Sequence, residues 1–305
     1  MFSSTIIPTI GRATLSHAVN SVLEQDFDAD DFEVIVVNDS GQPLPDDEWQ
    51  LSGRVRVIDT QCRERSVARN TGAAISKGKY FNFLDDDDIL LPGALNAFWK
   101  LSHTNDMADW LYGAWRTVDN AGNVVDEFYP KLTGNIFALL ISGEGLPLQA
   151  SLLKAKSFFI AGAYDPVPIL NGVEDRDIGR RIAFYGDVAY THTLVAQVRI
   201  GEVGSSTNWK VIAEGDRWGR EKALRMQESF KRLRTSATSS FMRGRVVRAY
   251  IASMFYNLKQ SNFFMAISRG LTGLAMAGLN VFRINIIHIF CLYCSNFCCH
   301  HDYSF

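Results

Sequence analysis

Residues 32–41 read FEVIVVNDSG, an unbroken run of apolar and mostly β-branched residues that ends in an acidic turn. Such a run is typical of a strand covered on both faces, and it predicts a buried strand over Phe32–Asn38. Shorter runs of the same kind predict further strands at Ser3–Ile7, Val55–Ile58 and Tyr80–Leu84. The first hundred residues therefore contain four candidate strands.

Helical patterns lie between these strands. Over Arg12–Gln25, the residues Leu15, Val19 and Val22 recur on one helical face, and a second helix is expected over Ser66–Ser76. Because strands alternate with helices, the pattern predicts an α/β fold in which a mostly parallel sheet is flanked by helices.

The rest of the chain is less regular until about residue 209, where it becomes helical and basic. We expect a catalytic domain over 1–208 and a helical, basic C-terminal extension over 209–305. The elements expected between residues 109 and 208 are strands at Trp110–Trp115, Val188–Tyr190 and Leu194–Arg199 and a helix at Asp175–Tyr185.

Composition limits the class of protein. The chain has 305 residues, of which 47% are hydrophobic and 21% charged, so it can bury a large core and is not a disordered tail. A net charge of 31 − 33 = −2 argues against a general nucleic-acid binder. The charge is uneven, however: residues 229–305 carry nine Lys or Arg and one Asp (+8), which leaves −10 for residues 1–228. This asymmetry favours an acidic body that binds a cation and a basic end that meets an anionic surface.

Cysteine usage indicates a reducing compartment, because Cys62 is the single cysteine among the first 290 residues. The start of the chain lacks the basic and apolar regions of a signal peptide, so we expect a cytoplasmic protein. The remaining cysteines and two histidines crowd the C-terminus, where a zinc site is an alternative to a poorly ordered tail. They are Cys291, Cys294, Cys298, Cys299, His300 and His301.

One C-terminal segment predicts an amphipathic helix with a basic polar side. Its apolar stripe is Val247, Ile251, Met254 and Leu258, and its off-stripe cations are Arg245, Arg248 and Lys259. Such a helix either packs on the body or docks on a membrane surface. The uncharged run Gly270–Phe282 is too short to span a bilayer, and Arg283 interrupts it, so we expect interfacial contact at most.

Polar residues follow the predicted strands at their carboxyl ends, where open α/β sheets bind ligands. They are Pro8 and Thr9, then Asp39, then the run Asp85–Asp88. Four consecutive carboxylates repel one another unless a cation offsets them, and hard oxygen ligands suit Mg²⁺ or Mn²⁺. The alternatives are a solvated acidic loop, or Asp88 as the N-cap of a helix that begins near Pro92.

Four blocks in the chain together resemble an inverting family 2 glycosyltransferase of the GT-A fold. They are IIPTIGRATLSHAVNSVLEQDF (6–27), FEVIVVNDSG (32–41), CRERSVARNTGAAISKGKYFNFLDDDDILLPGAL (62–95) and GVEDRDIGRRIAFYGD (172–187). The resemblance implies transfer of a sugar from a nucleotide-diphosphate sugar, with a UDP-sugar favoured, to a glycan or lipid-linked acceptor in polysaccharide synthesis. It also implies Mn²⁺ or Mg²⁺ as cofactor and allows peripheral contact with a membrane.

By the same resemblance, Asp39 binds the nucleotide base, and Pro8 and Thr9 line the base pocket. Arg69 matches a basic residue near the nucleotide. The alternative interpretations are a turn-former for Asp39 and a surface arginine for Arg69.

The resemblance places the metal-binding D-x-D motif on Asp85 and Asp87, with Asp86 between them on the donor side. Asp87 would bind the metal directly, whereas Asp85 would face the donor ribose or the water shell of the metal. The bound metal would neutralise charge on the departing diphosphate.

Inversion needs a base that accepts the proton of the acceptor hydroxyl. The resemblance assigns that role to Asp175, with Glu174 and Asp177 as competitors. Carboxylates at a helix N-terminus also have a purely structural explanation, because they offset the helix dipole.

The chain departs from the family pattern at Ile10, where an aromatic residue is usual, and at Asn38, which leaves one carboxylate fewer after the second strand. The loop after Arg199 lacks the usual histidine, so a role for Arg199 or Ser205–Ser206 at the diphosphate is doubtful. The rival interpretations are a nucleotidyltransferase, disfavoured because no glycine-rich phosphate loop follows the first strand, and a catalytically silent sugar-nucleotide or glycan-binding module.

Overall fold

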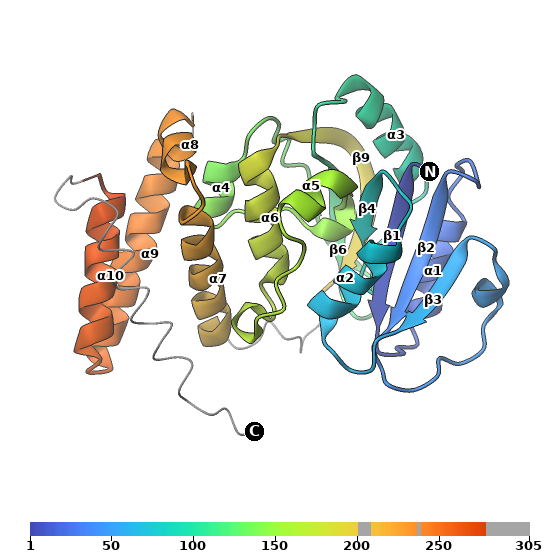
Figure 1. Ribbon diagram of the computed structural model, residues 1–305, viewed down its shortest axis with the longest axis horizontal. Coiled ribbons are helices and arrows are strands. Elements are labelled where there is room, and N and C mark those ends of the chain that lie inside the picture. Colours follow the sequence, from blue (N-terminus) through green and yellow to red (C-terminus); the bar gives the residue numbers. More distant parts are fainter. Residues whose placement is uncertain (201–208, 237–238, 279–305) are drawn as a thin grey trace. The chain divides into compact units, whose positions relative to one another are not determined.

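The computed structural model describes residues 1–200, 209–236 and 239–278, and contacts divide it into two compact units (Figure 1). The first unit comprises Met1–Leu140 and Gly145–Arg232, and the second comprises Ile141–Glu144 and the chain from Leu233 onward. Contacts thus separate the chain near residue 232, whereas the extent 1–208 of a catalytic domain stays a prediction.

One mixed sheet organises the first unit. Its strands follow the order β3-β2-β1-β4-β8-β6-β9-β5, and β7 pairs with β6 outside this path. The strands are β1 (Ser3–Thr9), β2 (Phe32–Asn38), β3 (Val55–Asp59), β4 (Tyr80–Phe83), β5 (Ile89–Leu90), β6 (Trp110–Val118), β7 (Val124–Phe128), β8 (Ser151–Lys154) and β9 (Val188–Arg199).

The first four strands pair in parallel, as the sequence predicts, whereas the sheet as a whole is mixed rather than mostly parallel. The pairs β1·β2, β2·β3 and β1·β4 are parallel, so the ends of β1, β2 and β4 meet at one edge. Beyond β4 the pairing changes, because β8 runs antiparallel to both β4 and β6. The two strands expected near residues 188–199 form one strand, β9, which is parallel to β6 with register shifts near Gly113.

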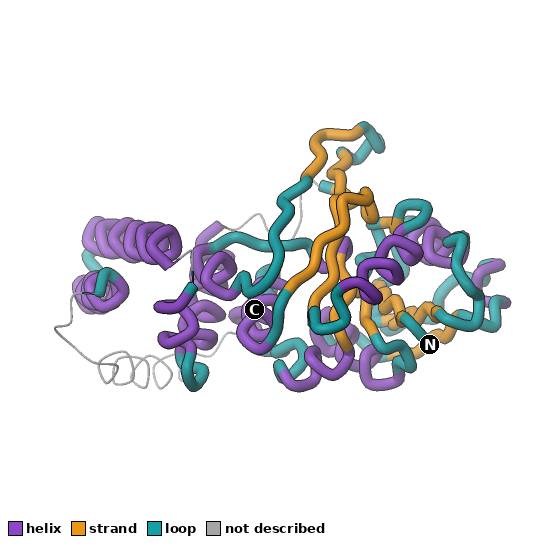
Figure 2. The backbone as a smooth tube through the Cα atoms, turned by 90° about the horizontal axis from the view of Figure 1, so that it is seen from above, coloured by secondary structure: helices purple, strands orange, loops and turns teal. Residues whose placement is uncertain are grey.

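Helices cover both faces of the sheet (Figure 2). The helices are α1 (Leu15–Leu23), α2 (Arg65–Ile75), α3 (Ala94–Thr104), α4 (Phe137–Ser142), α5 (Ala155–Ile160), α6 (Glu174–Tyr185), α7 (Trp209–Leu224), α8 (Ser229–Thr235), α9 (Ser239–Lys259) and α10 (Phe263–Met276), with 3-10 turns η1 (Glu48–Leu51), η2 (Leu148–Ala150) and η3 (Pro168–Leu170).

The alternation of side chains along β1 assigns the helices to faces. Ile7 belongs to the core that packs against α1 and α3, whereas Ile6 points to the other face, where it meets Gly72 of α2. Helix α1 begins at Leu15 rather than at the expected Arg12, which leaves Arg12 in the loop after β1. This loop lies at the edge where β1, β2 and β4 end.

Buried ion pairs join α7 to α6. Arg180 donates to Asp216 at 2.5 Å, and Asp177 accepts from Arg181 at 2.6 Å and from Lys222 at 3.2 Å. Because Asp177, Arg180 and Arg181 are buried, each of these charges depends on its partner. The pairs fix α7 against the helix that begins with Glu174 and Asp175.

In the second unit, α9 and α10 pack against each other. Gly273 of α10 lies against Tyr250 of α9, which is buried together with Met242 and Val246. The expected stripe is partly covered, since Met254 lies against Gly270 of α10, whereas Ile251 and Leu258 are exposed. Among the described residues, no helix combines the length and the apolar character that crossing a bilayer requires. The C-terminal cysteine and histidine cluster lies outside the described residues.

Candidate active site

The acidic run Asp85–Asp88 forms the loop between β4 and β5, at the carboxyl end of β4. One oxygen atom from each of Asp85, Asp87 and Asp88 lies within 4.8 Å of the others. Three carboxylate oxygens that converge in this way match the hard ligands of Mn²⁺ or Mg²⁺. The residues present therefore fit the expected metal, and Asp88 extends the expected pair Asp85 and Asp87.

The side chain of Asp86 is not part of this carboxylate cluster and contacts the end of β1 and the loop after it instead. Its carboxylate accepts hydrogen bonds from the Thr9 hydroxyl at 2.6 Å and from Nη1 of Arg12 at 2.9 Å. The same Arg12 nitrogen lies 3.0 Å from Oδ2 of Asp87. Burial raises the pKa of Asp86, although Thr9 and Arg12 counteract that effect. Asp86 thus ties the acidic loop to the end of β1.

Asp88 is buried and accepts a hydrogen bond from the backbone N–H of Arg199 at 2.7 Å. Burial and the neighbouring Asp85 charge raise its pKa well above the usual range. The alternative role of Asp88 as a helix N-cap is wrong, since Gly93 occupies that position before α3. The side chain of Arg199 reaches the backbone carbonyls of Asp119 and Asn120 instead of the acidic loop.

Arg69 on α2 connects the acidic loop to the first turn of α6. Its side chain is only 3% exposed, so the alternative of a surface arginine is wrong. Nη2 donates to Asp85 at 2.6 Å, and Nη1 donates to Glu174 at 3.1 Å and lies 3.6 Å from Oδ1 of Asp175. Burial alone would raise the pKa of Asp85, but the charge and hydrogen bond of Arg69, together with Arg65 and Gln149, lower that pKa.

The three candidate bases at the start of α6 differ in their partners. Glu174 is 4% exposed and accepts from Arg69, Arg65 and the backbone N–H of Gly172. Asp177 belongs to the buried ion pairs with α7. The side chain of Asp175 is 33% exposed, and burial and the nearby carboxylates raise its pKa to about 6 although Arg69 opposes this.

Asp39 lies directly after β2, and its carboxylate organises the loop before α2. Oδ1 accepts from the Thr60 hydroxyl and the Arg63 N–H, both at 2.7 Å, and Oδ2 accepts from the Glu64 N–H at 2.9 Å. That loop contains non-glycine residues with positive φ, including Cys62 at 56°, a conformation that needs such support. Pro8 and Thr9, expected after the first strand, are its last two residues.

Comparison with known proteins identifies the family of the N-terminal part of the chain. The family described as glycosyl transferase family 2 matches residues 4–124. Residues 4–124 thus form a glycosyl transferase family 2 domain. The match contains β1, β2, α2 and the acidic loop, and it confirms the resemblance noted from the sequence.

Two curated relatives of this glycosyltransferase domain are each 29% identical to the chain. Poly(ribitol-phosphate) beta-N-acetylglucosaminyltransferase TarP of Staphylococcus aureus matches over 157 residues, 50% of this chain and 47% of its own. GalNAc(5)-diNAcBac-PP-undecaprenol beta-1,3-glucosyltransferase of Campylobacter jejuni matches over 169 residues, 52% and 47% respectively. The chain thus spans about half the length of these relatives.

A solved structure confirms that the glycosyltransferase fold is shared. S. aureus TarS 1–349 in complex with UDP-GlcNAc aligns with a TM-score of 0.58 over 89% of this chain and 91% of that chain, at 15% identity. The TarS 1–349 structure without that ligand gives a TM-score of 0.56. The GT-A architecture expected from the sequence is therefore confirmed.

Two residues of the candidate site, Gln149 and Tyr164, escaped the sequence analysis, and a third, Asp88, was expected only as part of the acidic run. Asp88 joins the carboxylate cluster, Gln149 donates to Oδ2 of Asp85 at 3.0 Å, and Tyr164 donates its hydroxyl hydrogen to Oδ1 of Asp175 at 3.0 Å. Gln149 lies in the short 3-10 turn η2 and Tyr164 in a loop, and neither belongs to a motif. Asp88 belongs to the acidic run for which the sequence predicts a cation, with a helix N-cap as the alternative.

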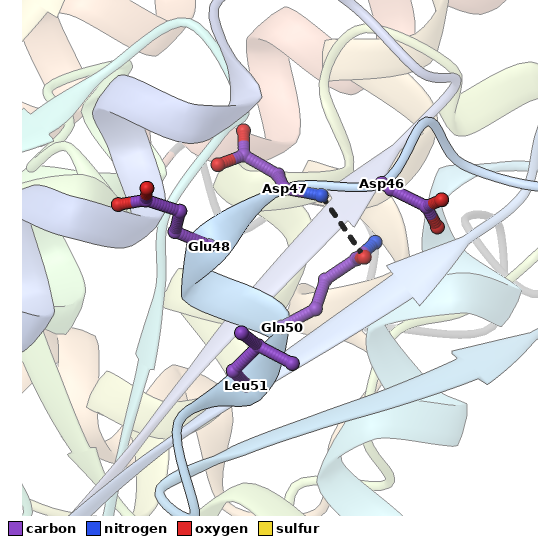
Figure 3. Close-up of a pocket in the computed structure, with 5 residues that line it drawn as sticks. All are labelled: Asp46, Asp47, Glu48, Gln50 and Leu51. Carbon is purple, nitrogen blue, oxygen red and sulfur yellow. Dashed lines mark hydrogen bonds between the residues drawn. The ribbon is translucent and has the colours of Figure 1, made fainter.

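An open surface depression lies apart from these residues, around Asp46, Asp47, Glu48, Gln50 and Leu51 (Figure 3). One of its carboxylates has a structural role, because Asp47 forms a capping box with Gln50 at the start of η1 and accepts a hydrogen bond from Ser16.

Proposed function

We propose that this chain is a metal-dependent, inverting glycosyltransferase that uses a nucleotide-diphosphate sugar. The observation that carries the proposal is the position of Arg69, which contacts Asp85 of the carboxylate cluster and lies beside Asp175 on α6. A cluster suited to a cation and a carboxylate with a raised pKa thus share one buried guanidinium. The pKa of Asp85 is lowered and that of Asp175 is raised. Pairs of carboxylates whose pKa values diverge in this way are typical of acid–base sites.

On the donor side, Asp85, Asp87 and Asp88 would hold Mn²⁺ or Mg²⁺, and Asp86 would orient the acidic loop through Thr9. The metal, when bound, supplies positive charge to the departing diphosphate. Asp39 would meet the nucleotide base beside Pro8 and Thr9. A UDP-sugar is the proposed donor, supported by the fold shared with a UDP-GlcNAc complex of TarS.

On the acceptor side, Asp175 would take the proton of the attacking hydroxyl. As the acceptor oxygen bonds to the anomeric carbon, the bond from that carbon to the diphosphate oxygen breaks, and the nucleoside diphosphate leaves with the electron pair. Glu174 is engaged by Arg69, Arg65 and Gly172, and Asp177 by Arg181 and Lys222, which favours Asp175 as the base.

The proposed acceptor is a glycan or a lipid-linked glycan at the cytoplasmic face of a membrane. Two observations support it: the relatives are named for poly(ribitol-phosphate) and undecaprenol-linked substrates, and the second unit is basic with exposed aromatic residues. Phe255, Phe263 and Phe264 are more than half exposed. Aromatic and basic side chains together favour contact with an anionic lipid surface.

The donor site is tested by thermal unfolding with UDP, GDP, dTDP and CDP, each with and without Mn²⁺. We expect one nucleotide to raise the melting temperature only with Mn²⁺, because a bound ligand stabilises the folded state. Asp87→Ala should lose this shift, whereas Asp106→Ala, at an exposed aspartate outside the cluster, should keep it. No shift with any nucleotide would contradict the proposal.

The rival function is a catalytically silent binding module. Asp175→Asn keeps the size of the side chain but removes the proton acceptor, so we expect it to abolish sugar transfer while the nucleotide-induced thermal shift remains. The measurement is release of nucleoside diphosphate in the presence of acceptor, beside the same thermal shift. An unchanged rate in Asp175→Asn would exclude Asp175 as the base.

A further inference from the structure

Tyr164 lies in the loop after α5, with its ring buried between the sheet and α5. The ring packs edge-on against Phe83 of β4 and against Phe158 of α5, with centroid distances of 5.1 and 5.8 Å. Its hydroxyl group, at the end of this apolar slot, donates to Oδ1 of Asp175 at 3.0 Å. The apolar packing therefore fixes the place of one polar atom.

Two neighbouring residues of α2 hold Tyr164 from other directions. The Asn70 side chain accepts from the Tyr164 N–H at 2.9 Å and donates to the Tyr164 carbonyl at 2.8 Å. The guanidinium of Arg69 lies over the Tyr164 ring, 5.2 Å from its centroid. A tyrosine with both backbone groups and its ring fixed can hold its hydroxyl partner in one position.

Only one of the two Asp175 oxygens is engaged within the described chain. Both the Tyr164 hydroxyl and Arg69 lie next to Oδ1, and Oδ2 has no hydrogen-bond partner among the described residues. The charged groups that face Asp175 are Arg69, Glu174 and Asp85. Burial and the Asp175 charge raise the pKa of Tyr164, so its hydroxyl keeps its hydrogen and remains a donor.

We propose that Tyr164 is the positioning residue of the base, binding Oδ1 of Asp175 so that Oδ2 faces the acceptor hydroxyl. This inference rests on the proposed function, since it assumes that Asp175 accepts the acceptor proton. In this role Tyr164 acts through Asp175 rather than on the reacting atoms themselves. It acts by orienting the carboxylate and by stabilising its ionised form.

The test compares Tyr164→Phe with wild type in steady-state transfer assays between pH 5 and 8, at saturating donor and Mn²⁺. Hydrogen bonds to charged groups are worth enough for kcat to fall about tenfold to a hundredfold, with the donor KM unchanged. The acid limb of the kcat profile should move to higher pH, because the lost bond favoured the ionised carboxylate.

Tyr80→Phe is the matched control, because Tyr80 is also buried but its hydroxyl has no partner in the described structure. It should keep the wild-type kcat and pH profile. The nucleotide-induced thermal shift of Tyr164→Phe should equal that of wild type, which separates misplacement of the base from loss of the fold.

Two results would overturn the role of Tyr164: a wild-type kcat and acid limb in Tyr164→Phe, or a lower kcat with an unmoved acid limb. Asp175→Asn distinguishes this failure from failure of the proposed function. If Asp175→Asn abolishes transfer while Tyr164→Phe behaves as wild type, only the positioning role is lost. If Asp175→Asn transfers sugar normally, the base itself is wrong.

Discussion

Glu174 and Asp175 are adjacent carboxylates at the start of α6, yet their surroundings give them different chemistry. Glu174 is saturated by two arginines and a backbone N–H, so it serves to hold α2 against α6. Asp175 keeps one oxygen without a partner in the described chain, and its pKa is raised to about 6. Partners and burial, not residue type, separate the structural carboxylate from the proposed base.

The raised pKa of Asp175 predicts the pH dependence of the reaction. A base must be ionised to accept a proton, so kcat should be constant at neutral pH and fall below about pH 6 as Asp175 is protonated. The fall should approach tenfold per pH unit in assays at saturating donor and Mn²⁺. These conditions limit the contribution of Asp86 and Asp88, whose pKa values are also raised.

The control for this profile is the thermal stability of the protein over the same pH range, which shows whether the loss reflects unfolding. A kcat that stays level down to pH 5, in a protein that remains folded, would contradict the assignment of a titrating base at this site.

Much of the site could be anticipated from the sequence because its residues follow strands in recognisable blocks. Asp85, Asp87 and Asp175 could be assigned candidate roles in this way, although these roles remain proposals. Tyr164 could not be anticipated, because its contact with Asp175 depends on how an irregular loop crosses the start of α6. Local sequence patterns do not predict such a contact between a loop and a helix.

At the scale of elements, α2 deserves a test because it carries Arg69 and Asn70. It approaches the sheet closely through Gly72, where an added Cβ atom would lie 2.5 Å from Cγ2 of Ile6 and 3.0 Å from Cγ2 of Val37. Gly72→Ala should therefore push α2 outward, lower the free energy of unfolding by about 1–3 kcal/mol and reduce kcat through Arg69. Denaturant unfolding and the transfer assay measure these two effects.

Gly53→Ala provides the comparison, because a Cβ atom there meets nothing within 4 Å. It should be neutral in both measurements. Equal stability of the two variants would mean that α2 does not need its close approach to the sheet.

The strands also show where sequence patterns predict structure and where they fail to. Phe32–Asn38 was predicted with its observed bounds because a continuous β-branched run has few alternatives. In the other half of the sheet β6 and β9 were predicted, but β7, β8 and the antiparallel pairing were not, since β8 has only four residues and β7 is exposed along its whole length. Such strands are specified by their neighbours rather than by their own alternation.

At the scale of the whole molecule, the uneven charge predicts a salt-dependent affinity for anionic lipid. Residues 229–301 contain no acidic residue, and Arg243 and Arg248 on α9 are exposed. Sedimentation with vesicles should show stronger binding to anionic than to neutral lipid, weakened by added salt. The double variant Arg243→Glu/Arg248→Glu should bind anionic vesicles about tenfold more weakly.

Lys100→Glu/Lys156→Glu makes the same change of charge at exposed positions of the first unit. It should bind vesicles nearly as well as wild type. If both double variants lose affinity equally, net charge alone would explain the binding and α9 would have no specific part in it.

The contacts of Arg12 and Arg69 with the acidic loop have a consequence for handling the protein. Their guanidinium groups already offset part of the negative charge of Asp85, Asp86 and Asp87. The chain thus carries its own counter-ions, and chelating agents should leave it folded and recoverable, unlike proteins whose fold collapses once a structural ion is stripped away. A metal ion that enters the site must compete with these guanidinium groups for the carboxylates. Its occupancy of the site should therefore be low until the nucleotide binds.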